Sequence, residues 1–322
     1  MAIKPSATRA ESVVKPRIFL TGGGGMVGRN ILEHPLASQW DFVAPSSREL
    51  DLADFDATRR FLAEYRPDAV IHCAGLVGGI QANIARPVDF LVVNVDLGRN
   101  VIMAAREAGV QKLLNLASSC MYPREAPNPL NEELILRGEL EPTNEGYAIA
   151  KIFATRLCEY ISRETPEKQY KTLIPCNLYG RHDKFEPKHS HLIPAIIHKI
   201  HQAKTAGLPS VEIWGDGTAR REFMYAGDLS DAVLHALADF DSLPGMLNIG
   251  LGHDHSINDY YRTAAEVIGW TGEFVHDTSR PVGMKQKLVD IGRQRDWGWK
   301  ASTTLSEGIE KAYQFYLQDS QA

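Results

Sequence analysis

Short apolar runs alternate with helix-like stretches over the first 180 residues. The apolar runs predict strands, and the stretches between them carry helical spacing that ends at Pro or Gly. Strand–helix–strand repeats with short linkers give parallel strands with crossover helices, and so predict a doubly wound sheet. The predicted strands are Arg17–Thr21, Asp41–Ala44, Ala69–Cys73, Lys112–Ala117 and Lys171–Pro175; the predicted helices are Met26–Glu33, Ala53–Tyr65, Val88–Ala108 and Tyr147–Glu164.

The rhythm changes after about residue 180, where a polar loop at 182–189 opens a less regular region. The pattern there predicts a strand–turn–strand unit around a Gly-Asp-Gly turn, then a helix and a strand that return to the sheet. The elements predicted here are a helix at Leu192–Ala206, strands at Val211–Trp214 and Glu222–Tyr225, a helix near Leu229–Phe240, a strand near Met246–Ile249 and a final helix near Thr304–Leu317.

These elements predict an α/β fold, with a Rossmann-type doubly wound parallel sheet and a smaller α/β substrate-binding lobe. We expect residues 1–16 to be a flexible tail. The dinucleotide-binding domain is expected to comprise residues 17–180 with about 226–255. The substrate-binding domain is expected to comprise about 181–225 and 256–322.

Composition adds limits to this picture. The chain has 322 residues, of which 44% are hydrophobic and 23% charged, as in ordinary globular proteins. A net charge of −5 argues against a nucleic-acid binder, and no apolar run approaches the ~20 residues that span a bilayer. The four cysteines show no C-x-x-C spacing, so we expect no disulfide, no metal site and a cytoplasmic location.

A glycine-rich turn follows the first strand directly. Gly22, Gly25 and Gly28 form a G-x-x-G-x-x-G motif, and Met26 and Val27 open the helix after it. Glycines at this spacing let the backbone approach a pyrophosphate closely, and the helix N-terminus offers free N–H groups. The strand–turn–helix context therefore predicts a dinucleotide site rather than a plain glycine turn.

The end of the second strand indicates which dinucleotide binds. An NAD site usually has a carboxylate there for the ribose 2′-hydroxyl. Here the sequence runs through two serines to Arg48, which favours the 2′-phosphate of NADP(H) over NAD, although a solvated surface arginine would look the same. Asp51 and Leu52 are placed to contact the adenine, unless Asp51 is a helix cap. Ala74 and Gly75, at the end of the third strand, leave room for the cofactor.

Tyr147 and Lys151 stand one turn apart on a predicted helix. The ammonium is expected to lower the pKa of the phenol toward working pH, which makes Tyr147 a proton donor for carbonyl reduction. Ser118, at the end of the fourth strand, is expected to share the substrate oxygen with Tyr147. A chance pair of surface residues is the alternative, but the upstream dinucleotide motif argues against it.

Several segments, together with these motifs, resemble the GDP-L-fucose synthase family within the extended short-chain dehydrogenase/reductase superfamily, over nearly the whole chain beyond the tail. Taken together they are far more specific than the superfamily motifs. The segments are Gly25–Gly28, Val77–Asn83, Ser118–Pro123, Glu141–Lys151, Asn177–Gly180 and Ser190–Pro194.

The resemblance implies an enzyme that epimerises carbons 3 and 5 of a GDP-linked 4-keto-6-deoxy-mannose-type sugar and then reduces carbon 4 with NADPH. Cys120 and His191 match its acid/base pair, although packing and a polar loop are their plain alternatives. It places Tyr147, Lys151 and His191 at the cofactor as well. The residues that it implies for the substrate are Asn177, Lys199, Trp214, Arg221 and Lys287. It also implies a homodimer through the helices predicted at Val88–Ala108 and Tyr147–Glu164.

Four positions depart from the family pattern. Gly24 replaces a loop arginine that contributes to 2′-phosphate binding in the family, so Arg48 carries more of the NADP(H) assignment. Lys199 replaces an arginine, Gln286 a basic residue and Arg181 a proline, and these changes leave the sugar and base open. A related epimerase/reductase of a colitose or deoxyheptose pathway would look very similar. Two further alternatives are a nucleotide-sugar isomerase that regenerates its cofactor and a dinucleotide-sensing protein without catalysis.

Overall fold

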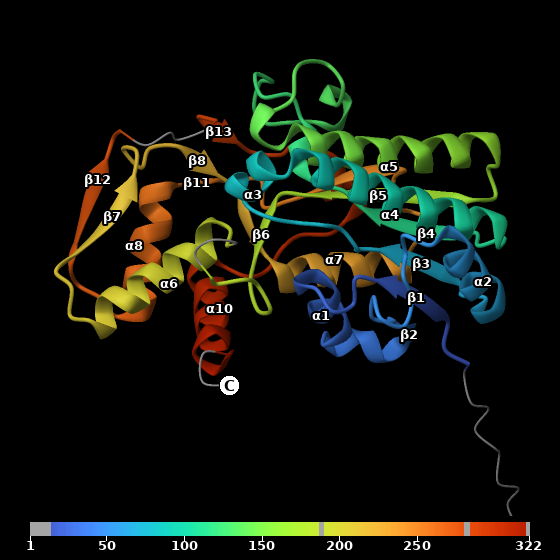
Figure 1. Cartoon of the computed structure of the whole chain (residues 1–322), viewed down its shortest axis with the longest axis horizontal. Coiled ribbons are helices and arrows are strands. Elements are labelled where there is room, and N and C mark those ends of the chain that lie inside the picture. Colours follow the sequence, from blue (N-terminus) through green and yellow to red (C-terminus); the bar gives the residue numbers. More distant parts are fainter. Residues whose placement is uncertain (1–13, 187–189, 280–283, 320–322) are drawn as a thin grey trace, which may run out of the picture.

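A six-stranded, wholly parallel sheet forms the centre of the computed structural model, which describes residues 14–186, 190–279 and 284–319 (Figure 1). Its strand order is β10-β5-β4-β3-β1-β2. The strands are β1 (Arg17–Thr21), β2 (Asp41–Val43), β3 (Ala69–His72), β4 (Lys112–Leu116), β5 (Gln169–Pro175) and β10 (Met246–Ile249). The Rossmann-type fold class is therefore confirmed, whereas residues 1–13 of the predicted tail lie outside the described residues.

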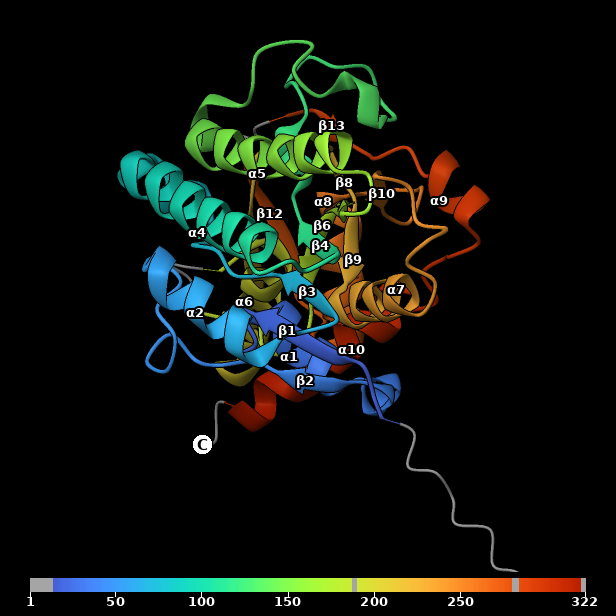
Figure 2. The same ribbon diagram turned by 90° about the vertical axis from the view of Figure 1, so that its right-hand side faces the viewer.

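Helices cover both faces of the sheet, as the two views show (Figures 1 and 2). The helices α2 (Phe55–Tyr65), α4 (Pro87–Glu107) and α5 (Glu145–Glu164) lie on one face, and α1 (Met26–Leu32) and α7 (Ala226–Ala238) lie on the other. The short helix α3 (Ile80–Ala85), which the sequence did not predict, precedes α4.

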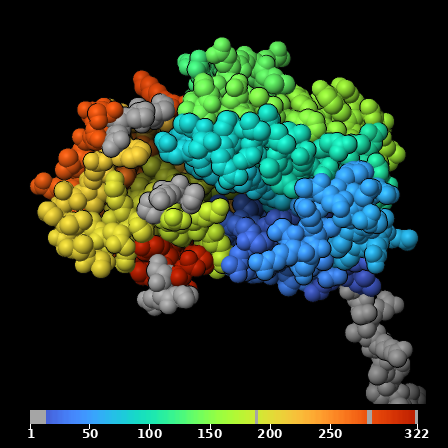
Figure 3. Space-filling model, in the orientation of Figure 1, coloured from blue at the N-terminus to red at the C-terminus, as the bar shows by residue number. Residues whose placement is uncertain are grey.

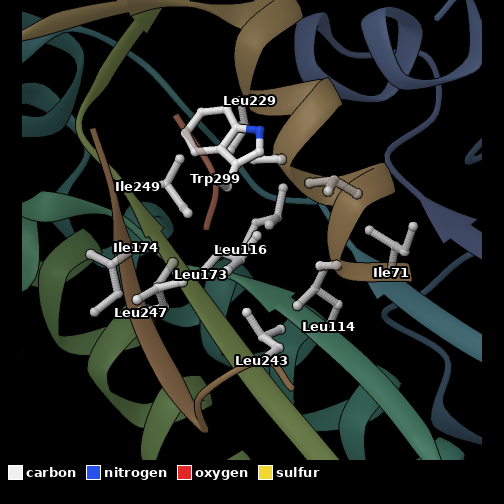
Figure 4. Close-up of a cluster of buried hydrophobic side chains, with 14 of the residues drawn as sticks. Ile71, Leu114, Leu116, Leu173, Ile174, Leu229, Leu243, Leu247, Ile249 and Trp299 are labelled. Carbon is white, nitrogen blue, oxygen red and sulfur yellow. The ribbon is translucent and has the colours of Figure 1, made fainter. Parts of the chain in front are cut away.

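Alternation along the strands explains this two-sided cover. On β1, Ile18 and Leu20 belong to a core shared with α1 and α7, which we call the α7-side core, whereas Phe19 belongs to a core shared with α2, α4 and α5. Successive strand residues point to opposite faces, so a strand that is apolar throughout must be buried on both. Figure 4 shows the α7-side core, in which Trp299 packs beside Leu229.

Most of the remaining elements build a lobe at one end of the molecule, yellow to red in Figure 3, whereas α9 (Gly292–Trp297) packs against β10. Its aromatic and aliphatic residues form a separate buried cluster, the lobe core. The elements beyond the sheet are β6 (Asn177–Tyr179), α6 (Leu192–Thr205), β7 (Ser210–Trp214), β8 (Arg220–Arg221), β9 (Phe223–Tyr225), β11 (His255–Ser256), α8 (Ile257–Ile268), β12 (Glu273–Asp277), β13 (Gln286–Lys287), α9 (Gly292–Trp297) and α10 (Leu305–Asp319).

One expectation for this region needs correction. Val211–Trp214 and Glu222–Tyr225 do not form one strand–turn–strand unit, because β7 pairs with β12, β8 with β11 and β13, and β9 with β6. Residues after 256 are also not all in the lobe core, since Val289 and Trp299 pack into the α7-side core. The pairing partners come from distant parts of the chain, which local pattern does not reveal.

Candidate active site

The glycine turn lies where the sheet changes direction. The chain leaves β1 for β2 on one side and returns to β3 on the other, which opens a crevice at the strand ends. Gly22 has φ +72°, and a Cβ there would lie 2.8 Å from the backbone nitrogen of Ala74. A Cβ on Gly28 would clash with the carbonyl oxygen of Gly22. These two positions therefore require glycine, because neighbouring backbone atoms already fill the place of a side chain.

The N-terminus of α1 faces this crevice. Its N-cap is Gly25, which has no side chain to cap the helix, so the first N–H groups of Met26 and Val27 have no partner within the helix. Unpaired amides at a helix start favour an anion. The turn and helix start thus fit a dinucleotide pyrophosphate.

Thr21 holds the ends of β1 and β3 together, which sequence reasoning missed. Its hydroxyl oxygen accepts hydrogen bonds from the backbone N–H groups of Cys73 (3.2 Å) and Ala74 (3.1 Å), and lies 2.9 Å from Nδ1 of His72. Burial lowers the pKa of His72 to about 3, so its ring is neutral. With both lone pairs engaged, the Thr21 hydroxyl donates its proton to His72 Nδ1. A threonine just before the glycines is the sequence signal.

The loop after β2 carries the residues predicted for the adenosine end. Arg48 is exposed. The Ser46 hydroxyl donates to the Glu49 carboxylate at 2.8 Å, so this serine is engaged locally. Asp51 accepts from the backbone N–H of Ala53 at 2.9 Å, while Asp54 is the residue that caps α2. Leu52 is half-buried beside the core under α2.

Ser118, Tyr147 and Lys151 come together at the end of β4. Ser118 opens a short 3-10 turn, and its hydroxyl accepts from the backbone N–H of Cys120 at 3.3 Å and hydrogen-bonds to Tyr147. Lys151 donates to the carbonyl of Leu116 at 2.9 Å, and its nitrogen lies 5.7 Å from the centre of the Tyr147 ring. The carbonyl of Leu116 on β4 thus holds the Lys151 ammonium near the Tyr147 ring.

The charge states differ from the sequence prediction. Burial raises the pKa of Tyr147, the nearby Cys120 adds to this, and the Ser118 hydrogen bond offsets only part. The expectation that Lys151 lowers the pKa of Tyr147 is therefore wrong, because desolvation outweighs it. Burial also lowers the pKa of Lys151 to about 8. Tyr147 consequently keeps its proton, which a proton donor needs.

Cys120 lies beside this group, half-buried in the 3-10 turn. The side-chain amide of Asn144 donates to its sulfur at 3.3 Å. Lys287, on β13, approaches the same sulfur with its ammonium at 3.8 Å. A predicted catalytic residue and a predicted substrate-binding residue are thereby in direct contact.

His191 is the N-cap of α6 and is half-buried. Burial lowers the pKa of its imidazole, and the charge of Lys184 lowers it further. The chain just before it meets the loop that leads into α3, where a Cβ on Gly79 would lie 3.3 Å from the carbonyl oxygen of Ser190. The helix α3 in turn packs against the turn at 142–144, which carries Asn144. The segment that leads into His191 therefore lies near this turn.

The other predicted substrate-binding residues lie on helices and strands beyond the central sheet. Lys199 donates to the carbonyl of Glu212, and half-exposed Trp214 donates to the Glu212 carboxylate at 2.9 Å. Arg221 and Lys287 are register partners on β8 and β13, so they share a face of that small sheet. Asn177 instead donates to the carbonyl of Glu222 at 3.0 Å, where it ties β6 to β9.

Three buried oxygen atoms near these residues lack a hydrogen-bond partner within the described part of the chain. They are Oδ1 of Asn83, Oδ1 of Asn144 and Oγ of Ser190. Buried polar atoms are nearly always paired, so unpaired ones mark places where a ligand hydroxyl or water completes the bonding. All three fall in the segments that resemble the family, which was their only signal in the sequence.

Comparison with known proteins agrees with this geometry. The profile of the NAD dependent epimerase/dehydratase family matches residues 18–250. A GDP-L-colitose synthase of Yersinia pseudotuberculosis is 51% identical over 94% of this chain and 98% of its own, and a GDP-L-fucose synthase of Azorhizobium caulinodans is 49% identical over 94% and 96%. A solved GDP-mannoheptose C4 reductase of Campylobacter jejuni with NADP bound superposes with TM-score 0.85 at 31% identity, covering 95% of this chain and 100% of its own.

Proposed function

We propose a specific activity for this chain, which belongs to the NAD dependent epimerase/dehydratase family. It is an NADP(H)-dependent 3,5-epimerase and 4-reductase that converts a GDP-4-keto-6-deoxy-mannose-type sugar to GDP-L-fucose or a close relative. The observation that carries the proposal is the thiol of Cys120 in contact with Lys287 and next to Ser118 and Tyr147. The proposal is supported by the relatives named as colitose and fucose synthases, which are identical to this chain at about half of the aligned positions.

The reduction uses the Ser118, Tyr147 and Lys151 group. A bound nicotinamide supplies the hydride for carbon 4 of the sugar. Tyr147, protonated in this environment, donates its proton to the oxygen on that carbon while Ser118 donates a hydrogen bond to the same oxygen. Lys151, held by the Leu116 carbonyl, places its positive charge below the phenol and favours loss of that proton.

The epimerisations use the same ketone before it is reduced. Hydrogens on the carbons beside a ketone are acidic, and Ser118 and Tyr147 are placed to stabilise the enolate oxygen. Inversion needs one group to remove a proton from one face and another to return it to the opposite face. Cys120 and His191 are assigned these two roles.

The binding assignments follow the crevice. Gly22, Gly25 and Gly28 would hold the pyrophosphate of the cofactor, and exposed Arg48 would pair with the 2′-phosphate. Lys199, Trp214, Arg221 and Lys287 would hold the nucleotide-diphosphate part of the sugar substrate. Residues 17–180 with about 226–255 are assigned to cofactor binding, and 181–225 with 256–322 to substrate binding.

The colitose-type reaction is a second candidate, since the Yersinia relative is 51% identical. Gln286, where the family has a basic residue, donates to Asp254 at 2.6 Å instead of offering a charge to the substrate. This difference concerns which sugar is preferred and leaves the chemistry at the ketone unchanged.

The deciding experiment identifies the product by NMR after incubation with GDP-4-keto-6-deoxymannose and NADPH in D₂O. We expect stoichiometric NADPH consumption and deuterium at carbons 3 and 5. Tyr147→Phe should lose about 100-fold or more of the reduction rate. Cys120→Ser should lose the deuterium exchange and keep NADPH binding. Exchange at the wild-type rate in Cys120→Ser would exclude Cys120 from the mechanism, and turnover without net NADPH consumption would identify an isomerase.

We also propose that the protein is a homodimer in the cytoplasm. Apolar side chains at helical spacing are exposed on the neighbouring helices α4 and α5: Val88, Val92, Ile149, Phe153 and Tyr160. Such stripes suit an isologous contact with a second copy. All four cysteines are free thiols, which suits a reducing compartment. Within the described residues, no helix has the length and apolarity to cross a membrane.

A further inference from the structure

Tyr122 ends the 3-10 turn that carries Ser118 and Cys120, and the proposed chemistry gives its phenol no task. The side chain is 2% exposed, and its hydroxyl donates to Oδ1 of Asn248 at 2.5 Å. Asn248 lies on β10, and β5 separates that strand from β4, which leads into the turn. Tyr122 thereby ties the turn after β4 to a second strand of the sheet.

Asn248 is fully buried, and each of its polar groups has a partner. Its side-chain amide donates to the carbonyls of Leu130 (2.9 Å) and Asp290 (3.0 Å), and its backbone N–H donates to the Glu132 carboxylate at 2.9 Å. Because carbonyl oxygens only accept, the amide nitrogen must face them, which leaves Oδ1 to accept the proton of Tyr122. The hydrogen bond between the two side chains therefore has one direction and one geometry.

The segment that Asn248 holds on its other side leads back to the substrate side of Cys120. The N–H of Asp290 donates to the carbonyl of Leu130 at 2.9 Å, so the two segments that Asn248 binds also bind each other. Asp290 follows Lys287 by three residues, and the Lys287 ammonium lies 3.8 Å from the Cys120 sulfur. Asn248 thus connects the turn that carries Cys120 to the segment that carries Lys287.

The two ends of the catalytic turn are held in different ways. Ser118 follows β4 closely and hydrogen-bonds to Tyr147 on α5, so the sheet and a long helix fix that end. Beyond Cys120 the chain is held by fully buried Met121 and by the Tyr122 hydroxyl. Apolar burial is non-directional, whereas a hydrogen bond restricts both distance and angle. The orientation of the Cys120 end therefore depends on Tyr122.

We propose that Tyr122 and Asn248 are positioning residues that align Cys120 with the sugar, so that inversion is complete before the ketone is reduced. The inference rests on the proposed function. Without the phenol hydroxyl, Ser118 and Tyr147 still hold the ketone for the hydride, but Cys120 is less well aligned with the neighbouring C–H bond. Misalignment slows the inversion more than the reduction. Since reduction removes the ketone, a sugar that is reduced early can no longer be inverted.

The test is Tyr122→Phe in the full-length enzyme, incubated with GDP-4-keto-6-deoxymannose and NADPH in D₂O. Phenylalanine keeps the ring and removes only the hydroxyl. We expect deuterium incorporation at carbons 3 and 5 to slow about tenfold, with a smaller change in NADPH oxidation. NMR should then find reduced sugar that lacks deuterium at one or both carbons, whereas the wild-type product carries it at both. Full labelling of the Tyr122→Phe product, at any rate of turnover, would overturn the proposal.

The matched control is Tyr170→Phe, which removes an equally buried phenol hydroxyl from the core on the other face of the sheet. Tyr170 is 1% exposed and donates to the carbonyl of Val110 at 3.0 Å. This variant should lose stability to a similar degree, measured by chemical unfolding, and still give fully labelled product. Incomplete labelling in Tyr170→Phe as well would show that general loosening is the cause, and would contradict a specific role for Tyr122.

Hydrogen–deuterium exchange of backbone amides tests the same positioning without any sugar. In Tyr122→Phe with NADPH bound, we expect faster exchange in peptides that cover 118–122 and 288–291, and unchanged exchange in β4. An enzyme that shows this pattern but does not turn over the GDP-4-keto sugar would contradict the activity only. Normal turnover with wild-type exchange in both peptides would contradict the positioning role only.

Discussion

Lys151 holds its ammonium inside the protein, where only one carbonyl oxygen, that of Leu116, receives it at 2.9 Å among the bonds that the described residues make. Burial lowers its pKa to about 8, whereas an unfolded chain titrates near 10.4. Below about pH 8 both states bind the proton, and the folded state carries the full cost of the buried charge. Between about pH 8 and pH 10.4 the unfolded chain binds more protons than the folded one.

The free energy of unfolding should therefore rise with pH across that window. We expect wild type to gain about 2 kcal/mol relative to Lys151→Met between about pH 8 and pH 10, measured by urea unfolding without ligands. Groups other than Lys151 contribute equally to both proteins and cancel in the difference. Parallel stability curves for the two proteins would contradict the buried-ammonium account.

At this scale the sequence predicted the chemistry of single residues better than their contacts. The spacing of Tyr147 and Lys151 on a helix is local, so it was readable. The contact of Cys120 with Lys287 joins residues 167 positions apart and depends on how the lobe docks, which no local pattern encodes. The raised pKa of Tyr147 was missed for a related reason, since burial is a property of the whole fold.

Among the elements, Glu222 between β8 and β9 connects two distant segments of the chain. Its buried carboxylate accepts backbone N–H groups of Leu251 (2.6 Å), Gly252 (3.0 Å) and Val289 (2.9 Å). It thereby joins the loop after β10 to the chain that follows β13. Burial raises the pKa of Glu222 to about 7, because the three hydrogen bonds offset only part of the desolvation of its carboxylate.

Removing this carboxylate should loosen both segments. We expect Glu222→Ala to destabilise the protein by about 3 kcal/mol, because it leaves several buried backbone donors without a partner. The affinity for the GDP-sugar should fall as well, since the strand carrying Lys287 loses its support. Chemical unfolding and substrate titration measure the two effects. The exposed Glu273 on β12 is the control, and Glu273→Ala should change stability by less than about 0.5 kcal/mol. A similarly small effect of Glu222→Ala would refute the connection.

The same residue explains where element prediction failed. The strands β1, β3 and β10 are mostly apolar runs, and their positions could be predicted closely from that property. The run Glu222–Tyr225 was predicted as one strand, but Glu222 turns its side chain inward to bind other loops, so β8 ends before it and β9 begins after it. Residues that serve distant segments do not follow the alternation of a local strand.

For the whole molecule, the exposed apolar stripes of α4 and α5 predict a dimer. These helices lie side by side over one face of the sheet (Figure 2). We expect Val92→Glu or Phe153→Glu to give a monomer in analytical ultracentrifugation, because each would place a charge in the apolar contact. Leu208 is exposed in the loop after α6, away from these helices, so Leu208→Glu should leave the dimer intact. A monomeric wild type, or a Leu208→Glu monomer, would contradict this interface.

The path of the chain crosses repeatedly between the lobe core and the α7-side core. It enters the lobe after β5, returns with α7 and β10, enters again with α8, returns with Trp299 and ends in the lobe with α10. A chimaera that exchanged one continuous cassette with a relative would therefore cut through both cores at once. We therefore expect point substitutions at the crevice to change the sugar preference with less loss of stability than an exchange of blocks.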